Sequence, residues 1–311
     1  MLTGVAFLLI NRTSILLITE TMKKSGVYLI LTATFLWFVV GCRGIGNGGE
    51  SKLINDSTKI VSLNGTLSEI VAALGLENHI VGTDVASTYP ASLYGKPKVG
   101  HGKKIAAEGV LALHPDLVLG VREDVTPELE EQLRSAGARL LIFEHVFSVD
   151  GTKSLIKGVA DSLGLVQKGD SIIQVLEADL KKVEAIPGKE PKPKVLFIYA
   201  RGTGTMMVGG EGTQMEEMIR LAGGENAVSG FSDFKPLTSE ALVAADPDVL
   251  LLFSSGLESL GGANGLEAVQ GVMQTNAGRN KNIVDMDGQL LTGFGPRLGL
   301  ALLELKQKIN H

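Results

Sequence analysis

One histidine of the sequence, His101, has neighbours that suit a metal ligand. His101 lies between two glycines in VGHGKK, and two lysines follow it. Flanking glycines favour an exposed turn and let a flat group approach the backbone, and neutral imidazole is a common metal ligand. One histidine cannot make a zinc site, which usually takes three or four protein ligands. It can be an axial ligand of haem iron, because the porphyrin supplies the other four nitrogens. A plain surface histidine remains the alternative.

Cations and aromatic side chains that suit a flat, anionic ligand occur in other segments. Lys103 follows His101, Arg201 ends the β-rich run FIYARGTG, and Arg297 opens the last predicted helix in GFGPRLG. Beside a haem ligand, a lysine would suit a propionate as a point charge. Tyr89 and Tyr94 could pack against a flat ligand or supply a phenolate. For each cation the alternative is a solvated surface position.

The remaining histidines are weaker candidates for a ligand. His145 ends a predicted strand in FEHVFS and is the second candidate after His101. His79 follows a helix end, and His311 is the last residue. His114 falls within an internal repeat whose second copy carries Asp246, so we interpret it as part of the scaffold.

That repeat places two glutamates at matching positions. AAEGVLALHPDLVLG (106–120) resembles TSEALVAADPDVLLL (238–252), which puts Glu108 and Glu240 at the starts of matching helices. An acid there is stabilised by the helix dipole, and two such acids could also dock basic residues of a partner. A second matched pair, Glu69 and Glu217, comes from SEIVAALGLEN (68–78) and EEMIRLAGGEN (216–226) and is a rival for docking.

The spacing of these pairs differs between the two halves. Glu69 and Glu108 are 39 residues apart, whereas Glu217 and Glu240 are 23 apart. The first half therefore carries about 16 extra residues, mostly within 79–101. Function tends to reside in loops added to a scaffold, and His101 ends this insertion.

Short β-rich runs alternate with helical patterns from Lys59 onward, which predicts an α/β fold. We expect strands at 59–63, 80–81, 117–120, 140–143, 195–199, 249–253 and 283–286, and helices at 67–74, 107–113, 127–136, 214–222, 239–244 and 296–309. A long helical pattern over 151–185, with candidate bends at the Gly164 region and at Lys168-Gly169, ends at the Pro/Lys-rich segment 186–194. The prediction is two similar Rossmann-like lobes, 58–149 and 188–311, joined by a long rigid helix at 150–187, with a ligand cleft between the lobes.

The first part of the chain is typical of an export signal. Lys23 and Lys24 precede the apolar run 25–40, and small residues lead to Cys42. This order is typical of a secretory signal over residues 1–41, with Met22 as a candidate true start. It resembles a bacterial lipobox, in which Cys42 would be lipidated, although a signal anchor with an incidental cysteine is the alternative. Residues 43–57 predict a flexible tether, so we expect an exported, lipid-anchored protein.

Composition and motifs exclude several classes. The net charge of −5, which becomes −7 without residues 1–41, gives no general attraction to nucleic acid. The single cysteine excludes a disulfide framework and a thiolate metal cluster. The glycines of ARGTGTMMVGG lack the G-x-G-x-x-G spacing of a nucleotide site, and no G-x-S-x-G or H-E-x-x-H occurs. We therefore predict that the chain is not an enzyme.

From Lys59 onward, the chain resembles the helical-backbone class of solute-binding proteins, which serve ABC importers for haem, cobalamin and ferric siderophores. KIVSLNGTLSEIVAALG and LAGGENAVSGF carry this general resemblance. VGHGKKIAAEGVLAL, GFSDFKPLTSEALVAADPDVLLL and TGFGPRLG are similar to the haem branch, the HmuT/ShuT-like proteins. The resemblance implies an extracytoplasmic protein that captures haem and delivers it to a permease dimer with its ATPase.

The resemblance also implies roles for single residues. His101 stands where the haem branch usually has an iron-binding tyrosine, and Lys103 stands where it usually has an arginine. Arg201 falls where some relatives carry a second ligand or contact. Glu108 and Glu240 match the glutamates that dock onto permease arginines, which makes Glu69 and Glu217 scaffold.

Three alternatives to haem import stay open. The same fold could bind cobalamin or a ferric siderophore, although only 5% of the residues are aromatic, which is few for a siderophore site. The chain could be a haem-binding enzyme, since a single axial histidine fits that as well. It could also be a relay that presents haem to a receptor without a permease.

Overall fold

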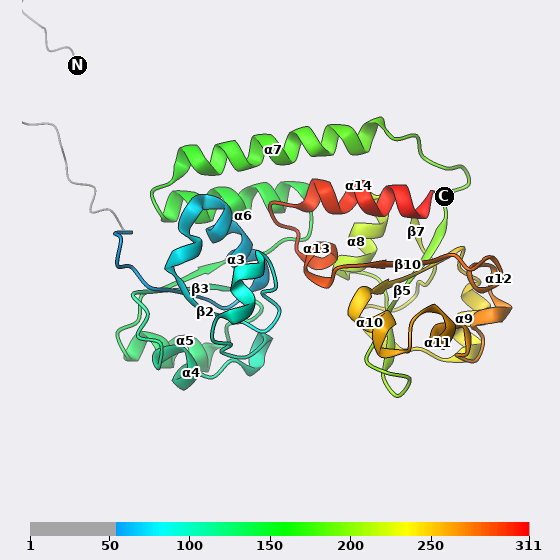
Figure 1. The fold of residues 1–311 in the computed structure, drawn as a ribbon, viewed down its shortest axis with the longest axis horizontal. Helices are drawn as coiled ribbons and strands as arrows, with labels where there is room; N and C mark the ends of the chain where they lie inside the picture. The colour runs from blue at the N-terminus through cyan, green and yellow to red at the C-terminus, as the bar shows by residue number, and fades with distance from the viewer. Residues whose placement is uncertain (1–53, 311) are drawn as a thin grey trace, which may run out of the picture. The chain divides into compact units, whose positions relative to one another are not determined.

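The structure, a computed structural model, describes residues 54–310. The predicted signal, the lipobox and Cys42 lie outside these residues. Within 54–310, no helix is both long and apolar enough to cross a membrane. The chain over this range forms two α/β lobes, as predicted (Figure 1).

The first lobe is built on a four-stranded parallel sheet. Its strands are β1 (Ile60–Ser62), β2 (Ile80–Thr83), β3 (Leu117–Val121) and β4 (Leu140–Phe143), in the order β2-β1-β3-β4. Its helices are α3 (Gly65–Val71), α4 (Ala107–Leu111) and α5 (Pro127–Ser135). Apolar side chains from both faces of the sheet enter separate buried clusters, as expected for a parallel sheet covered on both sides.

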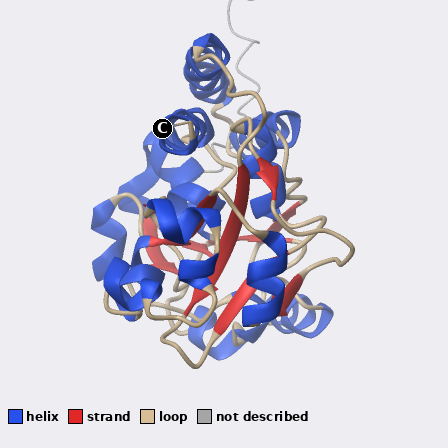
Figure 2. Cartoon of the chain, turned by 90° about the vertical axis from the view of Figure 1, so that its right-hand side faces the viewer, coloured by secondary structure: helices blue, strands red, loops and turns tan. Residues whose placement is uncertain are grey.

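The second lobe holds a mixed sheet of six strands. β5 (Lys194–Ala200), β9 (Val249–Phe253) and β10 (Ile283–Met286) are parallel, and the two-residue β7 (Glu225–Asn226) also pairs parallel with β5. The antiparallel strands β6 (Met206–Gly209) and β8 (Phe234–Pro236) extend the sheet and were not predicted, because neither short run shows a period-two pattern. The strands lie between helices on either side (Figure 2). Those helices are α8 (Gln214–Leu221), α9 (Ser239–Ala245), α10 (Ser254–Ser259), α11 (Ala263–Glu267), α12 (Asn276–Asn280), α13 (Gly288–Thr292) and α14 (Leu298–Ile309).

The predicted linking helix is two helices rather than one. α6 (Val149–Ser162) ends before Gly164, whose φ of 70° cannot continue a right-handed helix, and α7 (Val166–Ala185) folds back along α6. α7 then packs against α14 of the second lobe (Figure 1). A Cβ at Gly299 would lie 2.5 Å from the Cβ of Asp179, so glycine allows this close approach. α7 alone therefore spans the two lobes.

The internal repeat is reproduced at the level of hydrogen bonds. Oδ2 of Asp116 accepts from the backbone N–H of Lys59 at 2.8 Å, at the start of β1. Oδ2 of Asp248 accepts in the same way from Lys194 at 2.9 Å, at the start of β5. His114 and Asp246 both adopt positive φ, 47° and 38°, at matching turns. Because both residues make the same turn, His114 belongs to the scaffold.

Candidate ligand-binding site

A cavity of about 1110 Å³ lies between the two lobes. Its walls are formed where strands end: residues after β1, β2, β3 and β4 in the first lobe, and after β5, β9 and β10 in the second. Ligands of open α/β sheets bind at these carboxyl ends. The first lobe contributes Asp84, His101, Glu123, Asp124, His145 and Phe147; the second contributes Phe197, Tyr199, Arg201, Met207, Met215, Phe234 and Phe253, among others.

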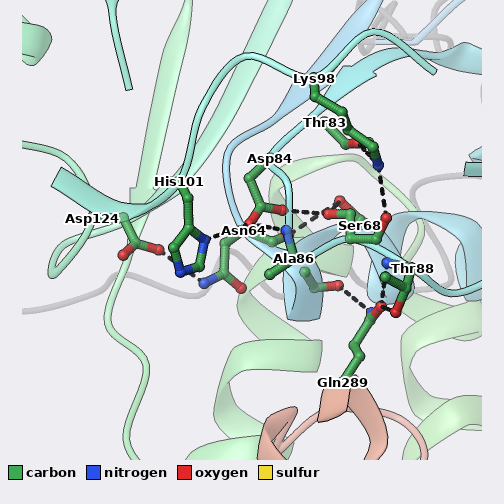
Figure 3. A network of polar contacts seen from close by, with 12 residues as sticks. Asn64, Ser68, Thr83, Asp84, Ala86, Thr88, Lys98, His101, Asp124 and Gln289 are labelled. Atoms are coloured by element: carbon green, nitrogen blue, oxygen red, sulfur yellow. Dashed lines mark hydrogen bonds and ion pairs between the residues drawn. The ribbon is translucent and has the colours of Figure 1, made fainter. Parts of the chain in front are cut away.

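His101 lies on the first-lobe wall, and its side chain is 67% exposed. Its Nδ1 is 3.3 Å from Oδ2 of Asp84, a residue that follows β2 (Figure 3). The backbone N–H of Val85 donates to the carbonyl of Gly100 at 2.8 Å, which closes the base of the intervening loop. This loop brings His101 and Asp84 together, although they are 17 positions apart in the sequence.

Asp84 is held firmly in place behind the histidine. Its carboxylate is 3% exposed; Oδ2 accepts from the backbone N–H of Ala86 at 2.9 Å and Oδ1 accepts from the hydroxyl of Ser87. Ser87 in turn lies 2.8 Å from the hydroxyl of Ser68 on α3. This network ties the loop to the lobe beneath it.

Lys98 links three parts of the same loop by hydrogen bonds. Its Nζ donates to Oγ1 of Thr83 at 2.9 Å and to the carbonyls of Ser87 at 2.8 Å and Leu93 at 3.1 Å (Figure 3). Burial lowers the pKa of Lys98, and the charge of Asp84 opposes that shift. This role was not predicted, because a lysine between Pro97 and Val99 is typical of a solvated position.

Two acidic side chains that follow β3, Glu123 and Asp124, line the same cavity wall as His101. Burial raises the pKa of Asp124, while a hydrogen bond of 2.9 Å from Nδ2 of Asn64 opposes the shift. Burial also raises the pKa of Glu123, and the charges of Asp124 and Glu144 add to it. This wall therefore holds protons more readily than free carboxylates would.

The second-lobe wall carries a tyrosine and an arginine at the end of β5. The Tyr199 ring meets Phe253 edge-on with centroids 6.1 Å apart, and the guanidinium of Arg201 lies 5.6 Å from the Tyr199 centroid. Arg201 was predicted from the sequence, whereas Tyr199 was not. The strand period could have found it, because residues i and i+2 of a strand point to one face.

His145 is a second histidine on the cavity wall. It is 9% exposed, its ring meets Phe147 edge-on at 4.8 Å, and its Nε2 makes no hydrogen bond within the part of the chain that the structure describes. Burial lowers its pKa, and the nearby backbone of Phe294 and Gly293 only partly opposes this. The ring is therefore neutral over a wider pH range than an exposed histidine.

Arg297 and Tyr89 lie together in the seam between the lobes and do not line the cavity. Nη2 of Arg297 donates to Oε2 of Glu69 at 2.8 Å, its backbone N–H donates to Oε1 at 3.1 Å, and its guanidinium lies 3.5 Å from the Tyr89 centroid. Glu69 is thus a buried structural acid. Lys103 is exposed in the turn after His101, near Glu123 and Asp124. The ligand roles of Lys103, Arg297 and Tyr89 stay predictions.

A glutamine of α13 also crosses the seam. Oε1 of Gln289 accepts from the backbone N–H of Thr88 at 2.6 Å, from its hydroxyl at 2.9 Å and from the N–H of Tyr89 at 2.7 Å. Its Nε2 donates to the carbonyl of Gly65 at 2.9 Å. With 8% of its surface exposed, Gln289 joins the second lobe to the loop that leads to His101 (Figure 3).

The two candidate docking glutamates are exposed in the first turns of α4 and α9. Both helices lie on the side of the molecule away from α7 (Figure 1). Hydrogen bonds from the backbone of Glu240 and from the side chains of Ser239 and Thr238 lower the pKa of Glu240. Both carboxylates are thus accessible from the solvent.

Two α/β lobes that enclose a cavity at the carboxyl ends of their strands define a two-lobed ligand-binding protein. Residues 60–290 match the periplasmic binding protein family, and the chain belongs to that family. It is a binding protein rather than an enzyme, as the absence of catalytic motifs predicted.

Several known proteins are similar to this chain. The structure of the periplasmic heme-binding protein RhuT from Roseiflexus sp. RS-1 is 40% identical, with a TM-score of 0.77 over 82% of this chain and 98% of that one. The periplasmic heme-binding protein BhuT in complex with two hemes is 36% identical, with a TM-score of 0.76 over 81% and 97%. The ABC transporter substrate-binding lipoprotein YvrC of Bacillus subtilis (strain 168), itself uncharacterized, is 29% identical over 81% and 79%. The vitamin B12-binding protein of Vibrio vulnificus (strain CMCP6) is 24% identical over 81% and 89%.

Proposed function

We propose that this protein captures haem in the cavity between its lobes and delivers it to the permease of an ABC importer. One observation carries the proposal: an imidazole on one wall of an aromatic-rich cavity faces a wall with a phenol and a guanidinium. Apolar side chains such as Phe147, Phe197 and Phe253 suit the faces of a porphyrin.

His101 would bind the iron. Its ring is accessible, lies on the cavity wall, and has one nitrogen at hydrogen-bond distance from Asp84, which leaves the other for a metal. The glycines on both sides of His101 have no Cβ, so the ligand could approach the backbone closely there. Imidazole serves both ferrous and ferric haem, whereas a tyrosinate favours ferric iron.

Tyr199 and Arg201 would act from the opposite wall. A phenol beside a guanidinium suits an iron-binding phenolate, and the guanidinium can also pair with a propionate. Solved relatives support this pair. The heme binding protein HmuT, 33% identical with a TM-score of 0.73, has also been solved as variants in which an arginine, a histidine or a tyrosine is replaced by alanine. In that protein the replaced tyrosine and arginine stand two positions apart, as Tyr199 and Arg201 do here.

Delivery would use the exposed face opposite α7. Glu108 and Glu240 occupy equivalent positions on the two lobes, so both could contact the same basic residue on each half of a permease dimer. Export and lipidation of Cys42 would hold the protein at the outer face of the cytoplasmic membrane, as the name of the lipoprotein YvrC suggests.

Cobalamin is the second candidate ligand, because curated relatives are named vitamin B12-binding proteins. The two ligands differ in what they need from this cavity. Cobalamin brings its own cobalt ligand and carries amides in place of propionates, so it would depend less on His101 and Arg201. Parallel titrations with hemin and cobalamin therefore separate the two.

The test is a hemin titration of residues 43–311 that follows the Soret band. We expect saturable binding, loss of the histidine-ligated spectrum in His101→Asn, and weaker binding in Tyr199→Phe. His114→Asn is the matched control, because His114 is exposed at a left-handed turn that asparagine also adopts. Absence of saturable binding in the parent protein would refute the proposal.

A further inference from the structure

Asp84 contacts one of the two ring nitrogens of His101. Oδ2 of Asp84 accepts from the N–H of Ala86, so this oxygen is an acceptor. Nδ1 of His101 lies 3.3 Å from the same oxygen and must therefore carry a proton to form a hydrogen bond. A neutral imidazole that is protonated at Nδ1 has its lone pair on Nε2.

We infer that Asp84 is a positioning residue that fixes the Nδ1–H tautomer of His101 and presents Nε2 to the iron of the bound porphyrin. The inference rests on the proposed function. Metal-binding histidines commonly donate their second N–H to a carboxylate, which fixes the ring and makes the ligating nitrogen more basic. Asp84 is well suited to this, because its carboxylate is 3% exposed and is held by Ala86 and Ser87.

The pair gives the imidazole some of the character of an anionic ligand. A carboxylate that accepts the Nδ1 proton pushes electron density toward Nε2, and this stabilises ferric over ferrous iron. A chain with histidine in place of an iron-binding tyrosinate could thus keep a preference for ferric haem. Asp170 is the matched comparison, because its side chain is exposed on α7 and does not line the cavity.

The first measurement needs no haem. Nitrogen NMR of the ¹⁵N-histidine-labelled free protein at about pH 8, above the ordinary histidine pKa, reports the tautomer of each ring, with His101→Asn to assign the signal. We expect His101 as the Nδ1–H tautomer and a shift toward Nε2–H in Asp84→Asn. An Nε2–H tautomer in the wild-type protein would overturn the inference.

The second measurement compares hemin affinity and midpoint potential. Asp84→Asn should bind hemin about 10- to 100-fold more weakly, the usual cost of losing a second partner of a metal ligand, and should raise the midpoint potential. Asp170→Asn, at an exposed position of α7 outside the cavity lining, should leave both close to wild type. In a His101→Asn background, Asp84→Asn should have no further effect.

These outcomes separate the inference from the proposed function. If wild type binds hemin but Asp84→Asn changes neither affinity nor potential, the inference fails and the function stands. If Asp84→Asn weakens binding equally without His101, Asp84 acts on the fold and the inference fails. If the wild-type protein does not bind hemin at all, the proposed function fails. The tautomer measured in the free protein then still decides whether Asp84 leaves Nε2 of His101 unprotonated.

Discussion

Gln289 tests how far the two lobes depend on one side chain. Replacing it with methionine keeps nearly the same length and removes four hydrogen bonds: those from Thr88 N–H, Thr88 hydroxyl and Tyr89 N–H, and the one to the Gly65 carbonyl. A typical hydrogen bond contributes about 1 kcal/mol net to stability. Because Tyr89 is 43% exposed, water can replace part of the lost bonding. We therefore expect Gln289→Met to lower the free energy of unfolding by about 3 kcal/mol.

The assay is urea unfolding and thermal melting followed by circular dichroism. For a domain of this size, 1 kcal/mol corresponds to roughly 2–4 °C, so the melting temperature should fall by about 6–12 °C. Gln132→Met on α5 is the matched control, because Gln132 is exposed; it should change stability by less than about 0.5 kcal/mol. If Gln289→Met costs no more than Gln132→Met, the four bonds do not hold the seam and the reasoning is refuted.

Three further predictions follow from the seam and the cavity wall. Arg297→Met removes the guanidinium that pairs with the buried Glu69 carboxylate, so it should lower the free energy of unfolding in urea by about 3 kcal/mol. Arg139→Met, at an exposed position, should leave it unchanged. Burial lowers the pKa of His145, so below about pH 6.5 the unfolded chain binds more protons than the folded one, and the free energy of unfolding falls by up to about 1.4 kcal/mol for each pH unit of acidification. Between pH 7.5 and 5.5, His145→Gln should therefore lose less stability than the wild-type protein; equal losses would contradict this. Solution scattering should show little change in radius of gyration when hemin binds, and a large decrease would contradict a rigid seam.

Much of the fold could be predicted because its signals are local. The strands Leu140–Phe143, Val249–Phe253 and Ile283–Met286 begin and end where the apolar runs do. Paired repeats also revealed two lobes, because each copy uses the same Pro-Asp turn to start a strand. The reversal of the chain at Gly164 was harder to predict than a bend, because the apolar period continues on both sides of it and only the positive φ ends α6.

The site was less predictable because its contacts join distant parts of the chain. His101 was found from its glycines and its place in the insertion, but its partner Asp84 lies 17 residues earlier, and nothing in the sequence links the two. Tyr199 was not predicted although Arg201 was chosen, and here the strand period, which places positions i and i+2 on one face, was a signal that was not used. Arg297 looked free until its partner, 228 residues away, was seen.

One short segment makes several of the hydrogen bonds that join the two lobes. Residues 289–297 contact the first lobe through the Gln289 amide, the Gly293 carbonyl, which accepts from Thr66, and the Arg297–Glu69 ion pair. The carbonyl of Phe294 adds a bond of 3.0 Å from Thr152 on α6. Three of these contacts meet α3 or the strand-end loops that also shape the cavity. The same residues that fix the two lobes therefore fix the cavity wall, which favours a preformed site over one assembled by closure.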